Sequence, residues 1–341
     1  MNYTFFTNSE KTWKALYEDI SRANKSVSME MYIFENTLEY NFYELLQKKS
    51  QEWLRVILIL DAFGSINLTQ HEIDAMKQSG VEILFQSYFF HRAHRKITII
   101  DESVAFIGGV NIHNVASRWN DLVVRVEGFL VKNIIKSLIK SYRDAGGKDE
   151  TLLQSKNTSL EKVNAWIIEH SPFRKIFNLK RIYTQHLSHA QKRITLVTPY
   201  FIPKRWLKAL LHQAVLRWVI VEVLVPEHTD HRIIDRVNYF FMRRLALLGV
   251  KFYLETTMNH AKLMVIDDNE WLVGSQNLDI LSFDFNSEIG VFFEDREVVS
   301  QLTKIADDWK KDATIFDPLH YQSRWFDVIL SSVIGFFSRI F

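Results

Sequence analysis

The feature that most limits how this chain can fold is a pattern of residues that occurs twice. It runs from His94 to Asn111 and again from His260 to Asn277. Each copy reads His-x-Lys, four residues, Asp, six residues, Gly, a small residue, any residue and Asn, without a gap. Other segments recur at the same interval of about 167 residues: 25–34 matches 192–201, and 55–60 matches 220–225. A repeat of this length indicates two duplicated domains rather than units of a solenoid.

The order of the segments predicts the fold of each half. Short apolar runs alternate with stretches of helical periodicity, which is typical of an α/β domain with a mixed sheet flanked by helices. We expect one domain at 1–155 and a second at 160–324, because the stretch 147–160 is polar and aperiodic. Since each half holds one copy of the motif, the halves are expected to meet about a pseudo-twofold axis with the active site at their interface.

Within each copy, the first three residues are expected to share a surface. Residues 96–100 and 262–266 are apolar strand candidates, and residues i and i+2 of a strand point to the same face. His94 and Lys96 therefore form one pair, and His260 and Lys262 form the other.

The end of each copy offers groups suited to an anion. Gly109 and Ser275 are small enough for the backbone to approach a bulky phosphate, and Asn111 and Asn277 carry amide donors. Together, two imidazoles, two ammonium groups and two amides suit a phosphate ester: one His attacks phosphorus and the other protonates the leaving oxygen. A single His-x-Lys on a strand would be unremarkable as a chance match, but two copies with matched spacing are not.

These residues resemble a known family. The two motifs are similar to the HKD motifs of the phospholipase D superfamily, and segments 29–34, 119–128 and 277–288 resemble its cardiolipin synthase branch, of the kind without an N-terminal membrane anchor. The resemblance extends from residue 5 to residue 312. It implies two tandem phospholipase D-like domains.

The resemblance also implies roles for four acidic residues. Asp121 and Glu288 would each hydrogen-bond the imidazole of their own motif and orient it, as the acid of a hydrolase triad does. Asp101 and Asp267 belong to the catalytic motifs, but a structural role is expected for them, because a carboxylate beside the reacting phosphate would repel it.

The implied activity is a phosphatidyl transfer to the headgroup alcohol of phosphatidylglycerol through a phosphohistidine, with His94 as nucleophile and His260 as acid and base. The sequence alone does not distinguish the two imidazoles. No cofactor and no metal are implied, because the lysines supply positive charge. A hydrolytic phospholipase D, a nuclease and a non-catalytic lipid-binding scaffold are the alternatives.

The amino-acid composition limits the kinds of ligand that the chain is expected to bind. Lys and Arg number 42 against 40 Asp and Glu, so nucleic acid is an improbable ligand and a phospholipid is the expected one. The chain has no Cys, which excludes disulfides and thiolate metal sites. We find neither a signal peptide nor an apolar run of spanning length, and expect a peripheral protein on the cytoplasmic side of a membrane.

Two further expectations concern single segments. The tail 325–341 has one apolar face and is expected to lie in a membrane interface, with packing on the domain core as the alternative. His113 follows the first motif closely and is expected to be an ordinary surface residue, with a place at the border of the pocket as the alternative.

Overall fold

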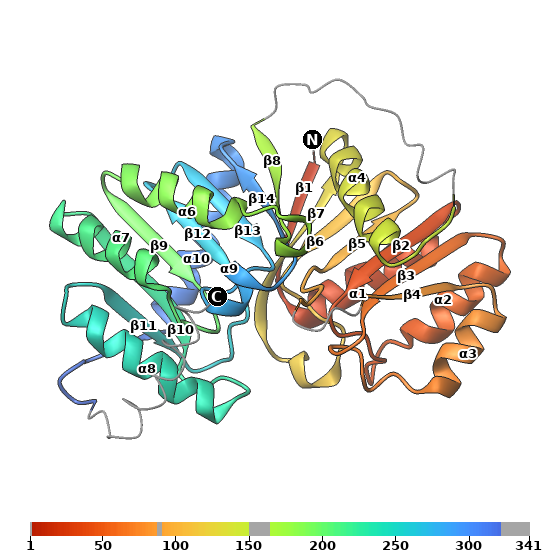
Figure 1. Cartoon of the computed structure of the whole chain (residues 1–341), viewed down its shortest axis with the longest axis horizontal. Helices are drawn as coiled ribbons and strands as arrows, with labels where there is room; N and C mark the ends of the chain where they lie inside the picture. The colour runs from red at the N-terminus through yellow and green to blue at the C-terminus, as the bar shows by residue number, and fades with distance from the viewer. Residues whose placement is uncertain (1, 87–90, 150–163, 322–341) are drawn as a thin grey trace.

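A computed structural model describes residues 2–86, 91–149 and 164–321. The tail 325–341, and most of the stretch expected to separate the domains, lie outside the described residues. Two β-sheets stand side by side, and helices cover their outer faces (Figure 1). This confirms the prediction of two tandem α/β domains, each with a mixed sheet.

The first half builds a seven-stranded sheet. Its elements in chain order are β1 (Asn2–Asn8), α1 (Ser9–Arg22), β2 (Ser26–Met31), α2 (Phe42–Gln51), β3 (Arg55–Asp61), α3 (Gln70–Gln78), β4 (Glu82–Gln86), β5 (Ile97–Ile100), β6 (Val104–Gly108), the 3-10 turn η1 (Asn114–Ala116), β7 (Asn120–Glu127) and α4 (Phe129–Asp144).

The second half builds an eight-stranded sheet. Its elements are β8 (Ala165–His170), η2 (Pro172–Arg174), α6 (Asn178–His189), β9 (Arg193–Val197), α7 (Arg205–Leu216), β10 (Ile220–Pro226), α8 (Arg232–Ala246), β11 (Lys251–Glu255), β12 (Leu263–Ile266), β13 (Glu270–Gly274), α9 (Ile280–Asp284), β14 (Glu288–Phe293), α10 (Arg296–Lys311) and β15 (Thr314–Ile315).

The two sheets have the same topology, as the internal repeat requires. The strand order is β1-β7-β6-β5-β2-β3-β4 in the first half and β8-β14-β13-β12-β9-β10-β11 in the second, where β15 adds an edge. Strands β2, β3 and β4 pair in parallel in the first half, as do β9, β10 and β11 in the second. The hairpins that carry the motifs, β5–β6 and β12–β13, pair antiparallel. The sequence interpretation did not identify β1 and β8, the strands beside β7 and β14.

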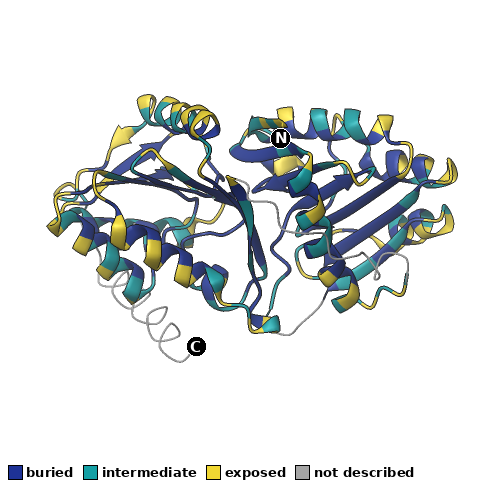
Figure 2. Cartoon of the chain, turned by 90° about the horizontal axis from the view of Figure 1, so that it is seen from above, coloured by how far each residue is buried: buried dark blue, intermediate teal, exposed yellow. Residues whose placement is uncertain are grey.

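Helix placement follows amphipathic patterning. Residues of the central strands are almost all buried, whereas exposed residues gather on the outward faces of the helices (Figure 2). Asn8 caps α1 by accepting a hydrogen bond from the Lys11 amide. Trp13, Leu16 and Ile20 recur at helical spacing and bury the inner face of α1 against the first sheet.

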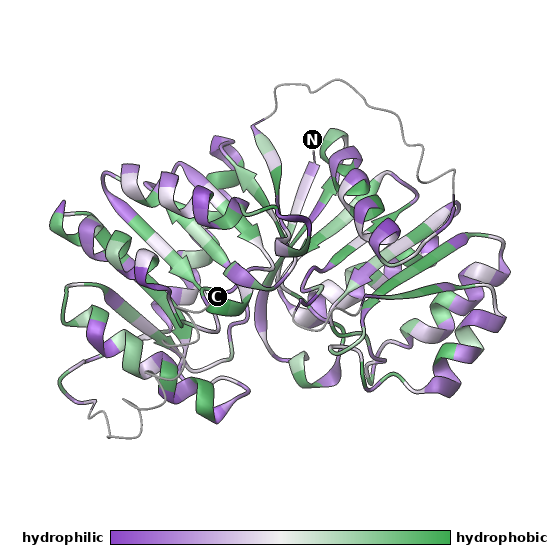
Figure 3. Cartoon of the chain, in the orientation of Figure 1, coloured by the Kyte–Doolittle hydropathy of each residue, from purple (hydrophilic) through white to green (hydrophobic). Residues whose placement is uncertain are grey.

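A shared apolar core joins the halves. Strands β6 and β7 pack against β13 and β14 at the centre of the molecule (Figures 1 and 3). Val124 of the first half and Trp271 and Phe293 of the second belong to one cluster of fully buried side chains. Burying apolar area of this kind is the main source of free energy for docking two domains.

Within the described ranges, no helix combines the length and the apolar character needed to cross a bilayer.

The Asp of each motif stabilises the turn of its hairpin. Asp101 and Asp267 both have a φ of 52°, at the sharp turn that follows β5 or β12. The Asp101 carboxylate accepts hydrogen bonds from the amides of Asn24, Lys25 and Ser26, at 2.7–3.0 Å for the shortest bond of each. Asp267 accepts the corresponding three bonds in the second half. Burial raises the pKa of Asp101, but these amide donors outweigh it and lower the pKa overall.

Replacing Asp101 tests this structural role. We expect Asp101→Asn to lower the free energy of unfolding by about 1–2 kcal/mol, because charged acceptance of three amide bonds is lost while the left-handed φ is tolerated. The matched control is Asp268→Asn, whose residue also has a left-handed φ, of 55°, at an exposed position. Chemical denaturation measures both. A loss of turnover beyond a hundredfold in folded Asp101→Asn would contradict a purely structural role.

Candidate active site

Both motif imidazoles face one cavity between the halves. His94 precedes β5, His260 precedes β12, and each side chain is buried except where it borders the cavity. The cavity has a volume of about 740 Å³ and is lined from both halves, with Asn111 and Asn277 among its walls. The structure therefore brings the two copies of the motif together, as the sequence predicted.

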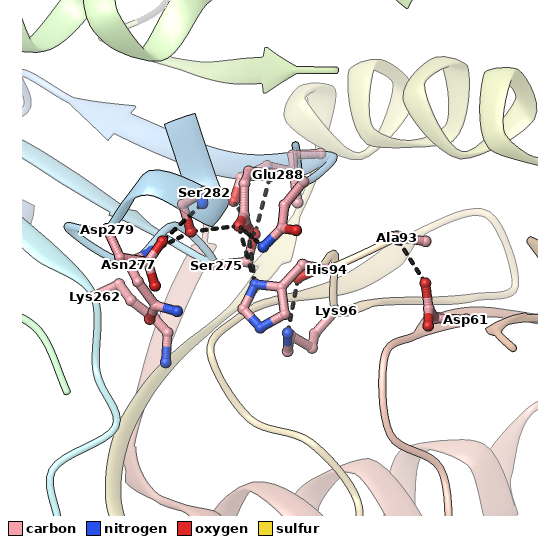
Figure 4. Close-up of polar contacts among 12 residues, drawn as sticks. Asp61, Ala93, His94, Lys96, Lys262, Ser275, Asn277, Asp279, Ser282 and Glu288 are labelled. Atoms are coloured by element: carbon pink, nitrogen blue, oxygen red, sulfur yellow. Dashed lines mark hydrogen bonds and ion pairs between the residues drawn. The ribbon is translucent and has the colours of Figure 1, made fainter. Parts of the chain in front are cut away.

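Each imidazole is held by a carboxylate of the opposite half. His94 Nδ1 lies 3.0 and 3.1 Å from the two oxygens of Glu288 (Figure 4). His260 Nδ1 lies 2.9 Å from Asp121 Oδ2. The prediction that each carboxylate pairs with the imidazole of its own motif is wrong, although both residues do orient an imidazole.

The sheet order explains the crossed pairing. In the first half, β6 lies between β5, which follows His94, and β7, which carries Asp121. Adjacent strands are about 4.8 Å apart, so the carboxylate of the same half starts about 10 Å away. The opposite half is closer, because its backbone bonds directly to the motif: the His94 amide donates to Ser287 O at 3.0 Å, and the His260 amide donates to Asn120 O at 2.7 Å.

Gly109 and Ser275, predicted to approach a phosphate, contact these carboxylates and are not among the described residues that line the cavity. A Cβ added to Gly109 would lie 2.2 Å from Asp121 Oδ1, so only Gly leaves room for that carboxylate. At the equivalent position, the fully buried Ser275 donates its hydroxyl to Glu288 Oε2. Asp101 and Asp267 lie at the far ends of β5 and β12, away from the imidazoles.

Each motif lysine folds back onto the backbone of the histidine in its own motif. Lys96 Nζ donates to the carbonyl of His94 at 2.7 Å, and Lys262 Nζ donates to the carbonyl of His260. Burial lowers the pKa of Lys96 to about 7 and that of Lys262 to about 8, and the charge of Lys262 contributes to lowering the pKa of Lys96. An anion bound in the cavity would restore the charged form of both, which suits a phosphate.

The side-chain amides of the two motif asparagines differ in their hydrogen bonds. Asn111 Oδ1 accepts a hydrogen bond from the Ile33 amide at 3.3 Å, which leaves its NH2 group as a donor at the cavity. Asn277 lines the cavity with an Oδ1 that has no hydrogen-bond partner in the described part of the chain.

The two His–carboxylate pairs are electrostatically unequal. Glu288 also accepts from the hydroxyls of Ser275 and Ser282. Burial raises the pKa of Glu288, but His94, Lys96 and Ser275 outweigh it and lower the pKa overall, so Glu288 is ionised and His94 presents a lone pair at Nε2. Burial raises the pKa of Asp121 to about 7, so below that pH the Asp121–His260 pair holds a proton that the Glu288–His94 pair lacks. This asymmetry favours His94 as nucleophile and His260 as acid.

Sequence reasoning missed several residues that line the cavity. His113 was expected at the surface, with the border of the pocket as the alternative; it is only 8% exposed and borders the cavity beside Trp119, so the alternative holds. Tyr200 and Asp230 also line it. The likeness of 192–201 to 25–34 could have pointed to Tyr200. In both segments the last residues lie just after the end of a strand, and the repeat places Tyr200 there. Asp230 lies in a loop after β10 that has no motif, and no pattern marked it.

Comparisons with known proteins agree with this geometry. A family model described as "Cardiolipin synthase, PLD-like domain" matches residues 16–143 and again 183–309. The chain is 27% identical to the probable cardiolipin synthase YwiE of Bacillus subtilis, over 95% of this chain and 69% of that protein. It is 30% identical to the cardiolipin synthase of Oceanobacillus iheyensis, over 87% of this chain and 66% of that protein. The chain thus spans about two thirds of the length of these relatives.

A solved structure shows the same fold. The phosphatidylserine synthase of Haemophilus influenzae superimposes with a TM-score of 0.77, at 14% identity, over 99% of this chain and 93% of that one.

Two tandem sheets with twin His-x-Lys motifs at a shared cavity define a phospholipase D-like protein. The chain belongs to the cardiolipin synthase family of phospholipase D-like domains.

The crossed pairing can be checked by NMR. In Glu288→Gln, we expect the Nδ1 proton of His94 to lose its strongly deshielded resonance, while that of His260 persists, because Glu288 bonds only the first ring. Asp121→Asn should give the reverse. Spectra of protein with 15N-labelled histidine measure both signals. If Glu288→Gln instead altered the His260 proton alone, pairing within each half would be correct.

Proposed function

We propose that this chain is a phosphatidyltransferase that joins a phosphatidyl group to the headgroup alcohol of phosphatidylglycerol. The observation that carries the proposal is the pair of unequal imidazoles at one cavity, each oriented by a buried carboxylate. The curated relatives that the chain resembles are named as cardiolipin synthases, which supports this acceptor over others.

In the first step, His94 Nε2 attacks the phosphorus of a bound phospholipid. The bond from phosphorus to the headgroup oxygen breaks, and His260 Nε2 donates its proton to that oxygen. Ionised Glu288 stabilises the positive charge that develops on the His94 ring. Lys96, Lys262 and the Asn111 amide stabilise the charge on the non-bridging phosphate oxygens.

In the second step, His260 acts as a base instead of an acid. His260 removes the proton of an incoming hydroxyl, whose oxygen attacks phosphorus while the bond to His94 Nε2 breaks. An alcohol gives a new phospholipid, and water gives phosphatidic acid. The same residues thus serve a transferase or a hydrolase, and the acceptor decides between them.

Product analysis tests the function. We expect the protein to convert vesicles of phosphatidylglycerol into diphosphatidylglycerol and glycerol. Phosphatidic acid as the main lipid product would make the chain a hydrolase. A protein without lipid turnover that cleaves DNA would be a nuclease, and the proposal would be wrong.

Two substitutions test the assignment of the imidazoles. We expect His94→Ala and His260→Ala each to lower kcat by at least about a thousandfold, and the double variant to be hardly slower, because the groups act as one unit. After a denaturing quench at alkaline pH, in which a phosphorus–nitrogen bond survives, lipid labelled at phosphorus should remain covalently attached to the wild type and be absent from His94→Ala. The control is His71→Ala, whose residue is exposed on α3. Label retained on His94→Ala and lost from His260→Ala would reverse the two roles.

We infer that the mouth of the cavity faces a membrane surface, peripherally and on the cytoplasmic side. Phe63 and Leu281, from opposite halves, border the cavity and are 58% and 57% exposed. Arg92 lies over the Phe63 ring at 4.3 Å and adds positive charge at the same place. Exposed apolar groups with a cation beside them suit the interface of an anionic bilayer.

The double variant Phe63→Ser/Leu281→Ser tests this orientation. We expect its affinity for vesicles of phosphatidylglycerol and phosphatidylcholine to fall by about tenfold or more, because two apolar side chains that would insert into the bilayer are removed. Co-sedimentation measures the affinity. The control is Trp53→Ser, which removes a 96% exposed side chain at the opposite end of β3. An equal loss in the control would show that this face does not dock.

A further inference from the structure

The two ends of the cavity differ in charge, although the halves are duplicates. At the His94 end, the Tyr32 ring lies 4.9 Å from the His94 ring, and the Arg92 guanidinium lies over Phe63. Phe63 belongs to the loop that follows β3. The corresponding loop of the second half, after β10, instead supplies Asp230. One end therefore carries a guanidinium and the other a carboxylate.

The acidic end has a defined hydrogen-bond geometry. Tyr200 Oη donates to Asp230 Oδ1 at 2.7 Å, and His231 Nε2 lies 3.6 Å from Asp230 Oδ2. Burial, followed by the charge of Asp230, raises the pKa of Tyr200, so the phenol keeps its proton and holds the carboxylate in place. The carboxylate has further lone pairs for a ligand, because it lines the cavity.

A buried imidazole, that of His113, completes this end. His113 Nε2 has no hydrogen-bond partner among the described residues, and the ring lines the cavity. Burial lowers the pKa of His113, so the ring is neutral at pH 7. Its ring meets Trp119 edge-on at 5.6 Å, and Trp119 in turn lies 5.4 Å from the His260 ring. An unsatisfied buried ring nitrogen costs free energy, and a ligand hydroxyl would remove that cost.

We propose that Asp230, Tyr200 and His113 form a subsite for the hydroxyls that neighbour the reacting hydroxyl of a polyol. The proposal rests on the phosphatidyl transfer proposed above and names its acceptor class. His260 accepts the proton of one hydroxyl as that oxygen forms its bond to phosphorus and the bond from phosphorus to His94 breaks. The remaining hydroxyls donate to Asp230 and bond to His113. The departing headgroup occupies the same subsite in the first step, since His260 serves both alcohols.

The charges of this end favour a neutral polyol over other headgroups. The Asp230 carboxylate would repel a phosphate or carboxylate. An ammonium would add a further positive charge near His260, whose pKa burial, Lys262 and Lys96 already lower. A hydroxyl both donates and accepts, which matches a carboxylate beside a neutral ring nitrogen.

Competition between acceptor alcohols tests the subsite. The wild type is given a dispersed short-chain phosphatidylcholine with equal concentrations of glycerol, 1-propanol and ethanolamine, and the three products are quantified. We expect glycerol to be favoured over 1-propanol. In Asp230→Asn and His113→Ala, this ratio should fall by about tenfold to a hundredfold, the usual effect of losing a hydrogen bond to a charged or buried group.

The ratio isolates the subsite, because every transfer uses the same nucleophile and base. The matched control is Glu227→Gln, which removes an equal charge from the same loop at a residue that does not line the cavity. Its ratio should equal that of the wild type. An unchanged ratio in Asp230→Asn, or no preference for glycerol in the wild type, would overturn the proposal. A preference for ethanolamine that Asp230→Asn abolishes would also overturn it, in favour of an ammonium site.

A binding measurement decides the question without turnover. His94→Ala is titrated calorimetrically with dispersed dicaproyl phosphatidylglycerol and with dicaproyl phosphatidylpropanol. A preference for the glycerol lipid that disappears in His94→Ala/Asp230→Asn supports the subsite. Equal affinities overturn it. If the wild type turns over no lipid but this preference is found, the proposed transfer is wrong and the polyol subsite stands.

Discussion

The bond between each catalytic imidazole and a carboxylate of the other half is the interaction on which the site depends. Asp121 and Glu288 are buried, and a buried carboxylate without a partner is costly. Each half alone would leave its carboxylate without its imidazole and its imidazole without a fixed orientation. The apolar core around Trp271 brings the halves together, and the crossed bonds fix how they meet. Docking of the domains and assembly of the active site are therefore one event.

The sequence predicted what depends on local pattern and on repetition. The matched spacing of the motifs predicted two duplicated domains, and apolar runs predicted most of the central strands. Strand β1 was missed because its place beside β7 is set by tertiary contact, and its seven residues show no clean alternation of burial. The pairing of carboxylates with imidazoles could not be predicted from spacing. Asp121 follows His94 by 27 residues and Glu288 follows His260 by 28, so both pairings look equal until the order of strands is known.

Small differences between the duplicated halves separate the chemistry of the two imidazoles. Gly109 leaves Asp121 room but gives it no hydrogen bond, and burial then raises the pKa of Asp121 to about 7. At the equivalent position, Ser275 donates to Glu288, and its hydroxyl helps to lower the pKa of that carboxyl. One substitution at a single motif position thus favours a proton on one pair and a free lone pair on the other. In a symmetric dimer of identical halves, the two pairs would be equivalent, and only the binding of substrate could make them differ.

The buried lysines lower the stability of the folded protein but favour the binding of a phosphate. A Lys whose pKa is lowered in the folded state disfavours its own charged form, so Lys96 and Lys262 reduce stability at every pH below their unfolded pKa of about 10.4. A bound phosphodiester adds negative charge beside both lysines and makes that charged form more favourable. Because such a ligand binds the folded state alone, it also stabilises the fold. The two buried lysines therefore lower the stability of the protein without ligand and raise its affinity for a phosphate bound beside the two imidazoles.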